Sequence, residues 1–140
     1  MEYKVKSVLL IDDDKECLFL HKYALRESKY IEHIEVAMNG EEALAFIQET
    51  VAANRPLPEI VFVDINMPVM DGWEFMEEFD ALPVHVKSKM NVVMLSTSVN
   101  PDDELRATTN SNVWRYCQKN LNSHQVTELV AALYVTGCRI

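Results

Sequence analysis

Apolar residues along the chain form two alternating kinds of segment. Continuous apolar runs with the length and composition of buried strands occupy 7–11, 34–38, 60–65, 91–95 and 113–117. Between them, apolar residues recur at the spacing that puts them on one face of a helix, as at Val126, Leu129, Val130 and Leu133. The pattern therefore predicts five strands, each followed by a helix.

Helix starts are marked by Asn or Asp three positions ahead of Glu or Gln, a spacing that satisfies the first free backbone N–H groups reciprocally. The pairs are Asn39 with Glu42, Asp71 with Glu74, and Asn122 with Gln125. Asn100 before Pro101 predicts a further start, and Asp14 is placed to cap a helix that begins at Lys15. Each predicted helix therefore has a recognisable first turn.

Five strand–helix units with continuously apolar central strands predict a parallel sheet that is covered by helices on both faces. Right-handed crossovers leave few topologies for such a sheet, and we expect a doubly wound α/β fold. Its functional site then lies beyond the carboxyl ends of the strands, where the strand order reverses. The residues that follow each strand are therefore the candidates for chemistry.

Composition and charge narrow the range of partners. At 140 residues, 49% hydrophobic and 25% charged, the chain is expected to form one globular domain over 1–140. A net charge of −9 and scattered Lys and Arg residues argue against nucleic acid and membrane surfaces as partners. No apolar run approaches the roughly 20 residues of a membrane span, so we expect a cytoplasmic protein with protein or metal partners.

Polar side chains with related chemistry follow four of the five predicted strands. In chain order they are Asp12, Asp13 and Asp14, then Asp64 and Asn66, then Ser96 and Thr97, and last Lys119. Carboxylates held within several ångströms of one another repel, so one takes up a proton or a cation enters. An all-oxygen site with few protein ligands suits Mg²⁺.

The ligands of softer metals do not gather at these strand ends. The histidines, which we expect at surface or boundary positions, are His21, His33, His85 and His124. The cysteines are far apart in sequence and indicate free thiols; they are Cys17, Cys117 and Cys138. Zinc and copper are therefore poor matches for the predicted site.

A carboxylate beside a cation can act as a nucleophile towards a phosphoryl group and form an aspartyl phosphate. A lysine and a hydroxyl then stabilise the other phosphoryl oxygens, and Asp64, Lys119 and Ser96 are of the right chemical types. Each also has a plain structural reading, as a strand-end acid, a surface lysine or a hydroxyl that bonds local backbone groups. Asp64 fits that reading least, because an unpaired carboxylate within an apolar run is costly to bury.

Four motifs in order, "LLIDDD", "VFVDINMPVMDG", "MLSTS" and "YCQKN", resemble those of the receiver domain of two-component response regulators. The resemblance covers nearly the whole chain. It implies a flavodoxin-like (βα)5 fold with a five-stranded parallel sheet of order 2-1-3-4-5. It also implies that Asp64 is the phosphoryl acceptor and that Lys119 contacts the phosphoryl group.

The resemblance assigns the metal ligands as well. It implies that Asp13 contacts Mg²⁺ directly, whereas Asp12 acts through a water. Asp64 and the backbone carbonyl of Asn66 complete the implied protein ligands, and Asp14 is left to cap the following helix.

The resemblance further implies a switch. Ser96 takes the position of the Ser/Thr switch hydroxyl and Tyr116 that of the aromatic residue that moves with it, although core packing explains Tyr116 as readily. The helix after Asn100 has Leu105 as its only large apolar residue, so we expect it to be short and exposed. Such a helix suits a surface that phosphorylation biases; the alternative is an ordinary solvated helix.

One position departs from the family pattern. Receivers typically follow the lysine with a proline whose preceding peptide bond is cis, whereas Asn120 follows Lys119 here. Because a non-proline cis bond costs about 2.5–4 kcal/mol, we expect a trans Lys119–Asn120 bond and a somewhat different loop.

The function implied by the resemblance is signalling and not enzymatic turnover, with at most self-phosphorylation from small phosphodonors and self-dephosphorylation. A sensor histidine kinase or histidine phosphotransfer protein would supply the phosphoryl group, and an unidentified protein would recognise the result. Because the chain ends soon after the last predicted helix, we expect a stand-alone receiver, with homodimer formation left open.

Two other classes stay open. A magnesium-dependent phosphatase or phosphotransferase similar to the haloacid dehalogenases also forms an aspartyl phosphate. Such an enzyme needs a second acid two positions after the nucleophile, where Asn66 stands, and a cap for which this chain is short. A degenerate receiver would bind partners without phosphorylation, and the intact set of Asp13, Asp64 and Lys119 argues against it.

Overall fold

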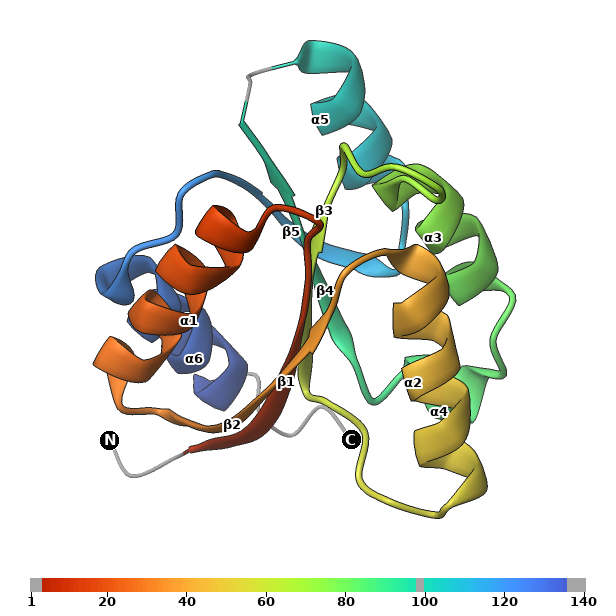
Figure 1. The fold of residues 1–140 in the computed structure, drawn as a ribbon, viewed down its shortest axis with the longest axis horizontal. Coiled ribbons are helices and arrows are strands. Elements are labelled where there is room, and N and C mark those ends of the chain that lie inside the picture. Colours follow the sequence, from red (N-terminus) through yellow and green to blue (C-terminus); the bar gives the residue numbers. More distant parts are fainter. Residues whose placement is uncertain (1–3, 98–99, 136–140) are drawn as a thin grey trace.

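Strands and helices alternate along the chain as the apolar pattern predicts (Figure 1). The computed structural model describes residues 4–97 and 100–135. The strands are β1 (Val5–Ile11), β2 (Ile31–Ala37), β3 (Ile60–Asp64), β4 (Asn91–Ser96) and β5 (Val113–Gln118). The helices are α1 (Lys15–Ser28), α2 (Gly40–Ala52), α3 (Gly72–Asp80), α4 (Val84–Lys87), α5 (Pro101–Thr109) and α6 (Ser123–Val135).

Two elements differ from the prediction. Helix α4 is a single turn of four residues, which is too short to show a helical period in the sequence. Strand β2 begins at Ile31, earlier than its apolar run indicates, because it lies at the edge of the sheet and exposes Glu32 and His33. Edge strands of this kind do not show the continuous apolar pattern of central strands.

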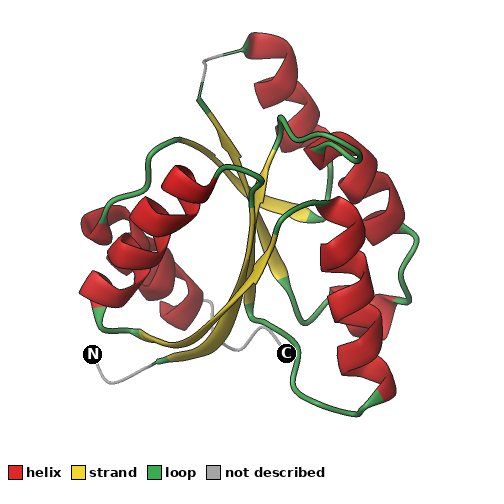
Figure 2. Cartoon of the chain, in the orientation of Figure 1, coloured by secondary structure: helices red, strands yellow, loops and turns green. Residues whose placement is uncertain are grey.

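The five strands form one parallel sheet of order β2-β1-β3-β4-β5, which confirms the predicted doubly wound, flavodoxin-like fold. Helices α1 and α6 pack on one face of the sheet, and α2, α3 and α4 cover the other (Figure 2). The chain adds β2 on one side of β1 and β3 on the other. The strand order therefore reverses between β1 and β3, where a doubly wound sheet places its functional site.

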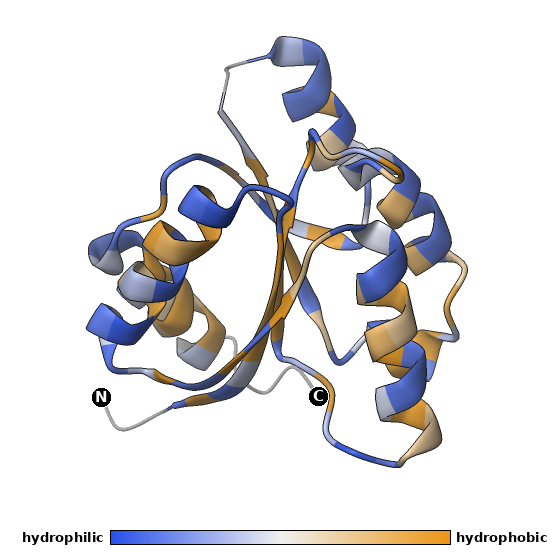
Figure 3. Cartoon of the chain, viewed as in Figure 1, coloured by the Kyte–Doolittle hydropathy of each residue, from blue (hydrophilic) through white to orange (hydrophobic). Residues whose placement is uncertain are grey.

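Alternate side chains of the central strands point into opposite halves of the core. Val63 packs towards α2 and α3, whereas Phe62 packs towards α1 and α6, and both are fully buried. Figure 3 shows orange, hydrophobic stretches in the central strands and helices that alternate between orange and blue. The apolar stripe of α3 is also buried; it consists of Phe75, Met76 and Phe79.

His21 corrects the expectation that all histidines lie at the surface or a boundary. It is fully buried on α1, in helical register with Leu18 and Leu25, a spacing that could have revealed its burial. Neither ring nitrogen makes a hydrogen bond to a described residue. Burial, helped by the positive charge of Lys119, holds the pKa of His21 below its ordinary value, so the buried ring is neutral.

The thiols of Cys17 and Cys117 are free, as predicted, and Cys138 lies outside the described residues. Cys117 packs against the core on the α6 side. None of the helices in the described ranges is both long enough and apolar enough to span a bilayer.

The predicted helix caps are present at α1, α2, α3, α5 and α6. Asp71 and Glu74 form a complete capping box at α3. At α2 the Asn39 side chain accepts from the Glu42 N–H group at 2.9 Å, but the Glu42 side chain accepts from the N–H group of Met38 and not that of Asn39.

The Asp14 side chain caps α1, and this role separates it from the two acids that precede it. One carboxylate oxygen accepts from the N–H groups of Glu16 at 2.9 Å and Cys17 at 3.4 Å. These bonds, with that of Glu16 the stronger influence, lower the pKa of Asp14. The acidic run that follows β1 therefore contains a structural residue.

We predict that Asp14→Ala lowers the free energy of unfolding by about 0.5–2 kcal/mol, because α1 loses its side-chain cap. Asp14→Asn is the matched control, since asparagine caps a helix nearly as well. Urea unfolding followed by circular dichroism measures both changes. Equal stability of Asp14→Ala and wild type would contradict the capping role.

Candidate functional site

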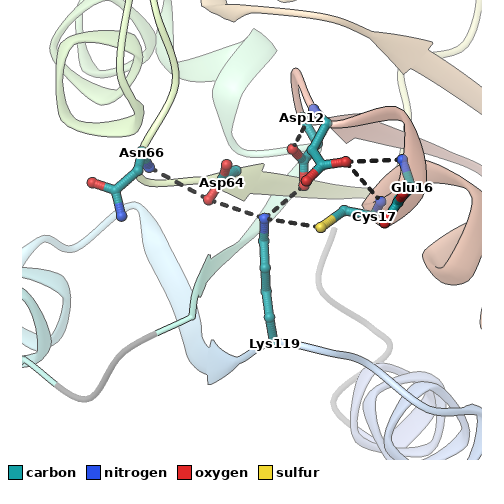
Figure 4. Close-up of polar contacts among 7 residues, drawn as sticks. Asp12, Glu16, Cys17, Asp64, Asn66 and Lys119 are labelled. Atoms are coloured by element: carbon teal, nitrogen blue, oxygen red, sulfur yellow. Dashed lines mark hydrogen bonds and ion pairs between the residues drawn. The ribbon is translucent and has the colours of Figure 1, made fainter.

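Three strand ends bring Asp12, Asp64 and Lys119 together (Figure 4). Asp12 follows β1, Asp64 is the last residue of β3, and Lys119 follows β5. The Lys119 Nζ atom lies 2.8 Å from Asp12 Oδ2 and 3.3 Å from Asp64 Oδ1. The three side chains are at most 7% exposed, so water screens these ion pairs weakly.

Backbone hydrogen bonds that extend the sheet hold these residues in place. The Asp12 N–H group donates to the Ala37 carbonyl at 3.1 Å, just beyond the end of β1. The Lys119 N–H group donates to the Ser96 carbonyl at 2.8 Å, just beyond the end of β5. The side chains of Asp12 and Lys119 therefore start from backbone that is already hydrogen-bonded, which holds their charges in place.

Asp13 adds a third carboxylate to the site. One carboxylate oxygen from each of Asp12, Asp13 and Asp64 lies within 4.8 Å of the other two. Asp13 is exposed, whereas Asp12 and Asp64 are buried. The donors are all oxygen, and one ammonium group does not balance three carboxylates, so this cluster fits a magnesium ion.

Burial raises the pKa of Asp64 to about 6. The positive charge of Lys119 acts in the opposite direction, and the negative charge of Asp12 raises the pKa further. Burial disfavours the charged form of Lys119, but its hydrogen bond to Asp12 and the charge of Asp64 outweigh that effect and raise the lysine pKa. Lys119 is therefore protonated throughout the range in which Asp64 titrates.

The loop after Asp64 passes close to the start of α3. The exposed Asn66 has its backbone N–H group 3.4 Å from Asp64 Oδ1, and Figure 4 shows its side chain turned away from Lys119. The Gly72 N–H group donates to the Ile65 carbonyl at 2.8 Å. A Cβ atom at Gly72 would lie 2.8 Å from the carbonyl oxygen of Asp64, so glycine is needed for this approach.

The two residues of the expected switch lie on neighbouring strands. Ser96 ends β4 and is 1% exposed, and Thr97 beyond it is exposed. The ring of Tyr116 on β5 packs against the same half of the core as α3. Its hydroxyl is buried and has no hydrogen-bond partner among the described residues.

The Lys119–Asn120 peptide bond is cis, so the expectation of a trans bond is wrong. The intrinsic preference for trans does not include the contacts that hold this segment. Lys119 is fixed through its N–H group by Ser96 and through its side chain by Asp12, and Leu121 is only 4% exposed. Tertiary contacts on both sides of Asn120 therefore determine the backbone conformation here.

Cys17 is a residue of this site that the sequence does not single out. Its Sγ atom accepts a hydrogen bond from Lys119 Nζ at 3.7 Å. Cys17 lies in the first turn of α1, which the Asp14 cap starts at the edge of the site. Cys17 follows Asp14 by three residues, and this helical spacing is the feature of the sequence that could have placed Cys17 beside the acidic run.

Comparison with known proteins points to a single family. The family described as "Response regulator receiver domain" matches residues 8–131. Response regulator Rcp1 from Synechocystis sp. is 30% identical over 129 residues, which cover 91% of this chain and 86% of Rcp1. The chain therefore belongs to the response regulator receiver family, whose members are signalling proteins.

Solved structures of response regulators share the fold. A two-component response regulator from Cytophaga hutchinsonii has a TM-score of 0.87 and 34% identity, covering 94% of this chain and 98% of that chain. The Mn(2+)-bound form of Rcp1 has a TM-score of 0.69 and 29% identity, covering 91% of both chains. The phosphorylated cyanobacterial phytochrome response regulator RcpA has a TM-score of 0.71 and 30% identity, covering 92% and 91%.

We predict that, without a divalent cation, Asp64→Asn is more stable than wild type at neutral pH. The folded-state pKa of about 6 exceeds the ordinary value of 3.8, so the folded state loses stability as pH rises and Asp64 ionises. The variant should gain on the order of 1–3 kcal/mol above about pH 7 and nothing below about pH 3, where Asp64 is protonated in both the folded and the unfolded state. Urea unfolding in EDTA across this range measures the difference, and a difference that does not vary with pH would contradict the raised pKa.

Proposed function

We propose that this chain, as a single receiver domain over 1–140, accepts a phosphoryl group on Asp64 from a sensor histidine kinase or a histidine phosphotransfer protein. The observation that carries the proposal is the meeting of Asp64, two further carboxylates and Lys119 at the carboxyl ends of the strands. The Lys119 ammonium group beside Asp64 supports it, because a positive charge at this position can offset the negative charge that a phosphoryl group adds.

In the proposed step, a carboxylate oxygen of Asp64 forms a bond to phosphorus while the bond from phosphorus to the donor's histidine nitrogen breaks. The electron pair of that bond stays with the nitrogen. Lys119 Nζ, 3.3 Å from Asp64 Oδ1, is close enough to pair with a phosphoryl oxygen. The Ser96 hydroxyl would donate a hydrogen bond to another.

Mg²⁺ is the proposed cofactor. Asp13 and Asp64 would hold it with the backbone carbonyl of Asn66, and Asp12 would act through a water. When bound, the ion neutralises charge on the carboxylates and on the phosphoryl group. The oxygen cluster of the three acids supports this assignment, as does the Mn(2+)-bound form of the similar Rcp1.

Output is proposed to pass through Ser96 and Tyr116 to a surface formed by α5, β5 and α6. An unpaired buried hydroxyl costs roughly 1–3 kcal/mol, so Tyr116 gains if its ring moves to a position with a hydrogen-bond partner. Helix α5 is short and, across its described residues, buries Ala107 alone. An unidentified target protein, or a second copy of this chain, would recognise the changed surface.

The proposed protein is a signalling phosphoacceptor whose chemistry is limited to its own phosphorylation and dephosphorylation. Asn66 occupies the position at which a related phosphatase would need its second acid. The cytoplasm is the proposed location, since the free thiols of Cys17 and Cys117 suit a reducing compartment.

The acceptor assignment is tested by incubating the protein with Mg²⁺ and acetyl phosphate and measuring the intact mass. We expect wild type to gain one phosphoryl group and Asp64→Asn, its closest isostere, to gain none. Addition that survives Asp64→Asn, or no addition to wild type, would contradict the proposal. Rapid hydrolysis of many phosphomonoesters would instead support a phosphatase.

We predict that Asp13→Ala weakens Mg²⁺ binding by at least about tenfold. Substitution of a residue that only supports a metal ligand already lowers metal affinity by about that factor. Asp14→Ala should leave the affinity unchanged, because the Asp14 carboxylate is engaged with α1. Isothermal titration calorimetry with MgCl₂ compares the two variants. Equal affinities would remove Asp13 from the set of ligands.

A further inference from the structure

Trp73 connects α3 to α5 by two different contacts. Its indole Nε1–H group donates to Asp103 Oδ1 at 3.0 Å, and the Arg106 guanidinium carbon lies 4.5 Å from the centre of its ring. Trp73 is 8% exposed, whereas Arg106 is exposed. We call Trp73, Asp103 and Arg106 the Trp73 clamp.

Helix α5 has little else to hold it against α3. Among its described residues Ala107 is the buried one, and Leu105 is 63% exposed. Two hydrogen bonds lie just beyond its carboxyl end. The Asp80 carboxylate accepts them from the side chains of Asn110 at 3.1 Å and Asn112 at 2.6 Å. Because apolar burial is so small, the Trp73 clamp is a principal restraint on the amino-terminal half of α5.

The Trp73 clamp also begins next to the acceptor. Trp73 directly follows Gly72, whose N–H group donates to the Ile65 carbonyl at 2.8 Å. A Cβ atom at Gly72 would lie 2.8 Å from the Asp64 carbonyl oxygen, so α3 starts in van der Waals contact with the acceptor residue. The residue before Trp73 therefore packs directly against the backbone of Asp64. Figure 1 shows α5 lying beyond the start of α3, on the same side of the sheet.

We propose that the Trp73 clamp holds α5 in the position it takes while Asp64 is unphosphorylated, and so sets the threshold for switching. This inference rests on the proposed function. A contact that stabilises one of two arrangements lowers the population of the other. In this proposal Asp64 reacts from the released arrangement, so the clamp slows phosphorylation by lowering the population that reacts. Releasing the clamp then makes Asp64 easier to phosphorylate although no residue of the site has changed.

The first test measures the clamp without phosphorylation. Hydrogen–deuterium exchange of the α5 peptide is compared in wild type, Arg106→Gln and Asp103→Ala. We expect the two variants to exchange about two- to fivefold faster, the factor that a cation–π contact at an exposed site, or one hydrogen bond, contributes to an equilibrium. Asp103 is partly exposed and Arg106 is exposed, so neither substitution removes a side chain from the buried core.

Two variants serve as matched controls. Asp102→Ala removes an acid from the same first turn of α5 and takes nothing from the clamp. Arg115→Gln removes a guanidinium that lies 4.5 Å from the centre of the Trp114 ring, the same distance as in the clamp. In Arg115→Gln we expect α5 to exchange at the wild-type rate. In Asp102→Ala we expect α5 to exchange more slowly than it does in Asp103→Ala.

The second test measures the rate at which acetyl phosphate and Mg²⁺ phosphorylate each protein, read by intact mass. We expect Arg106→Gln and Asp103→Ala to react about two- to fivefold faster than wild type, Arg115→Gln to react at the wild-type rate, and Asp102→Ala to react more slowly than Asp103→Ala. Unchanged α5 exchange, or faster exchange with an unchanged phosphorylation rate, would overturn the clamp and leave the proposed function standing. No phosphorylation of any of the proteins, wild type included, would overturn the proposed function itself and the switching role with it.

Discussion

Repulsion among carboxylates at one edge of the sheet is the constraint on which this site depends. The parallel strands deliver Asp12 and Asp64 to the same buried place, and the Lys119 ammonium group, 2.8 Å from one and 3.3 Å from the other, makes their proximity tolerable. A single positive charge does not balance both of them and Asp13 as well. Burial is the main cause of the raised pKa of Asp64, and the negative charge of Asp12 adds to it. A bound cation is the direct way to relieve the excess negative charge.

A chain of contacts also leads from Asp64 to a distant surface. The loop after Asp64 is pressed against Gly72, and Trp73 follows immediately with its contacts to α5. On the other side, the Ser96 carbonyl holds the backbone of Lys119. A phosphoryl group on Asp64, as proposed, would therefore act on residues whose positions are already tied to it. Helix α5 buries Ala107 alone among its described residues, so little apolar surface holds it in place.

Much of the fold could be predicted from the sequence because its central strands are continuously apolar and its helices carry side-chain caps. These signals are local, and they located the strand ends at which the candidate residues meet. His21, β2 and α4 show where local signals fail. The pattern of apolar residues along the sequence does not identify any of the three. His21 is a polar residue type in a buried position, β2 is an edge strand with exposed polar residues, and α4 is a single helical turn.

Other features depend on contacts that no local pattern contains. The cis bond between Lys119 and Asn120 depends on the tertiary contacts of the residues on either side. The intrinsic cost of a non-proline cis bond favoured the trans bond that we expected, and that expectation was wrong. The contact of Trp73 with Asp103 joins residues 30 positions apart. The position of Lys119 between two acids could be expected from the family motifs, but its distances could not. The roles of the site residues remain proposals that the geometry supports.

Locating the phosphoryl group tests the central claim most directly. Borohydride reduces an aspartyl phosphate to homoserine, and peptide mass spectrometry then identifies the residue that was modified. After incubation with Mg²⁺ and acetyl phosphate, we predict homoserine in place of Asp64 and at no other position. Homoserine in place of Asp12 or Asp13, or a phosphoryl group that resists borohydride, would contradict the claim that Asp64 is the acceptor.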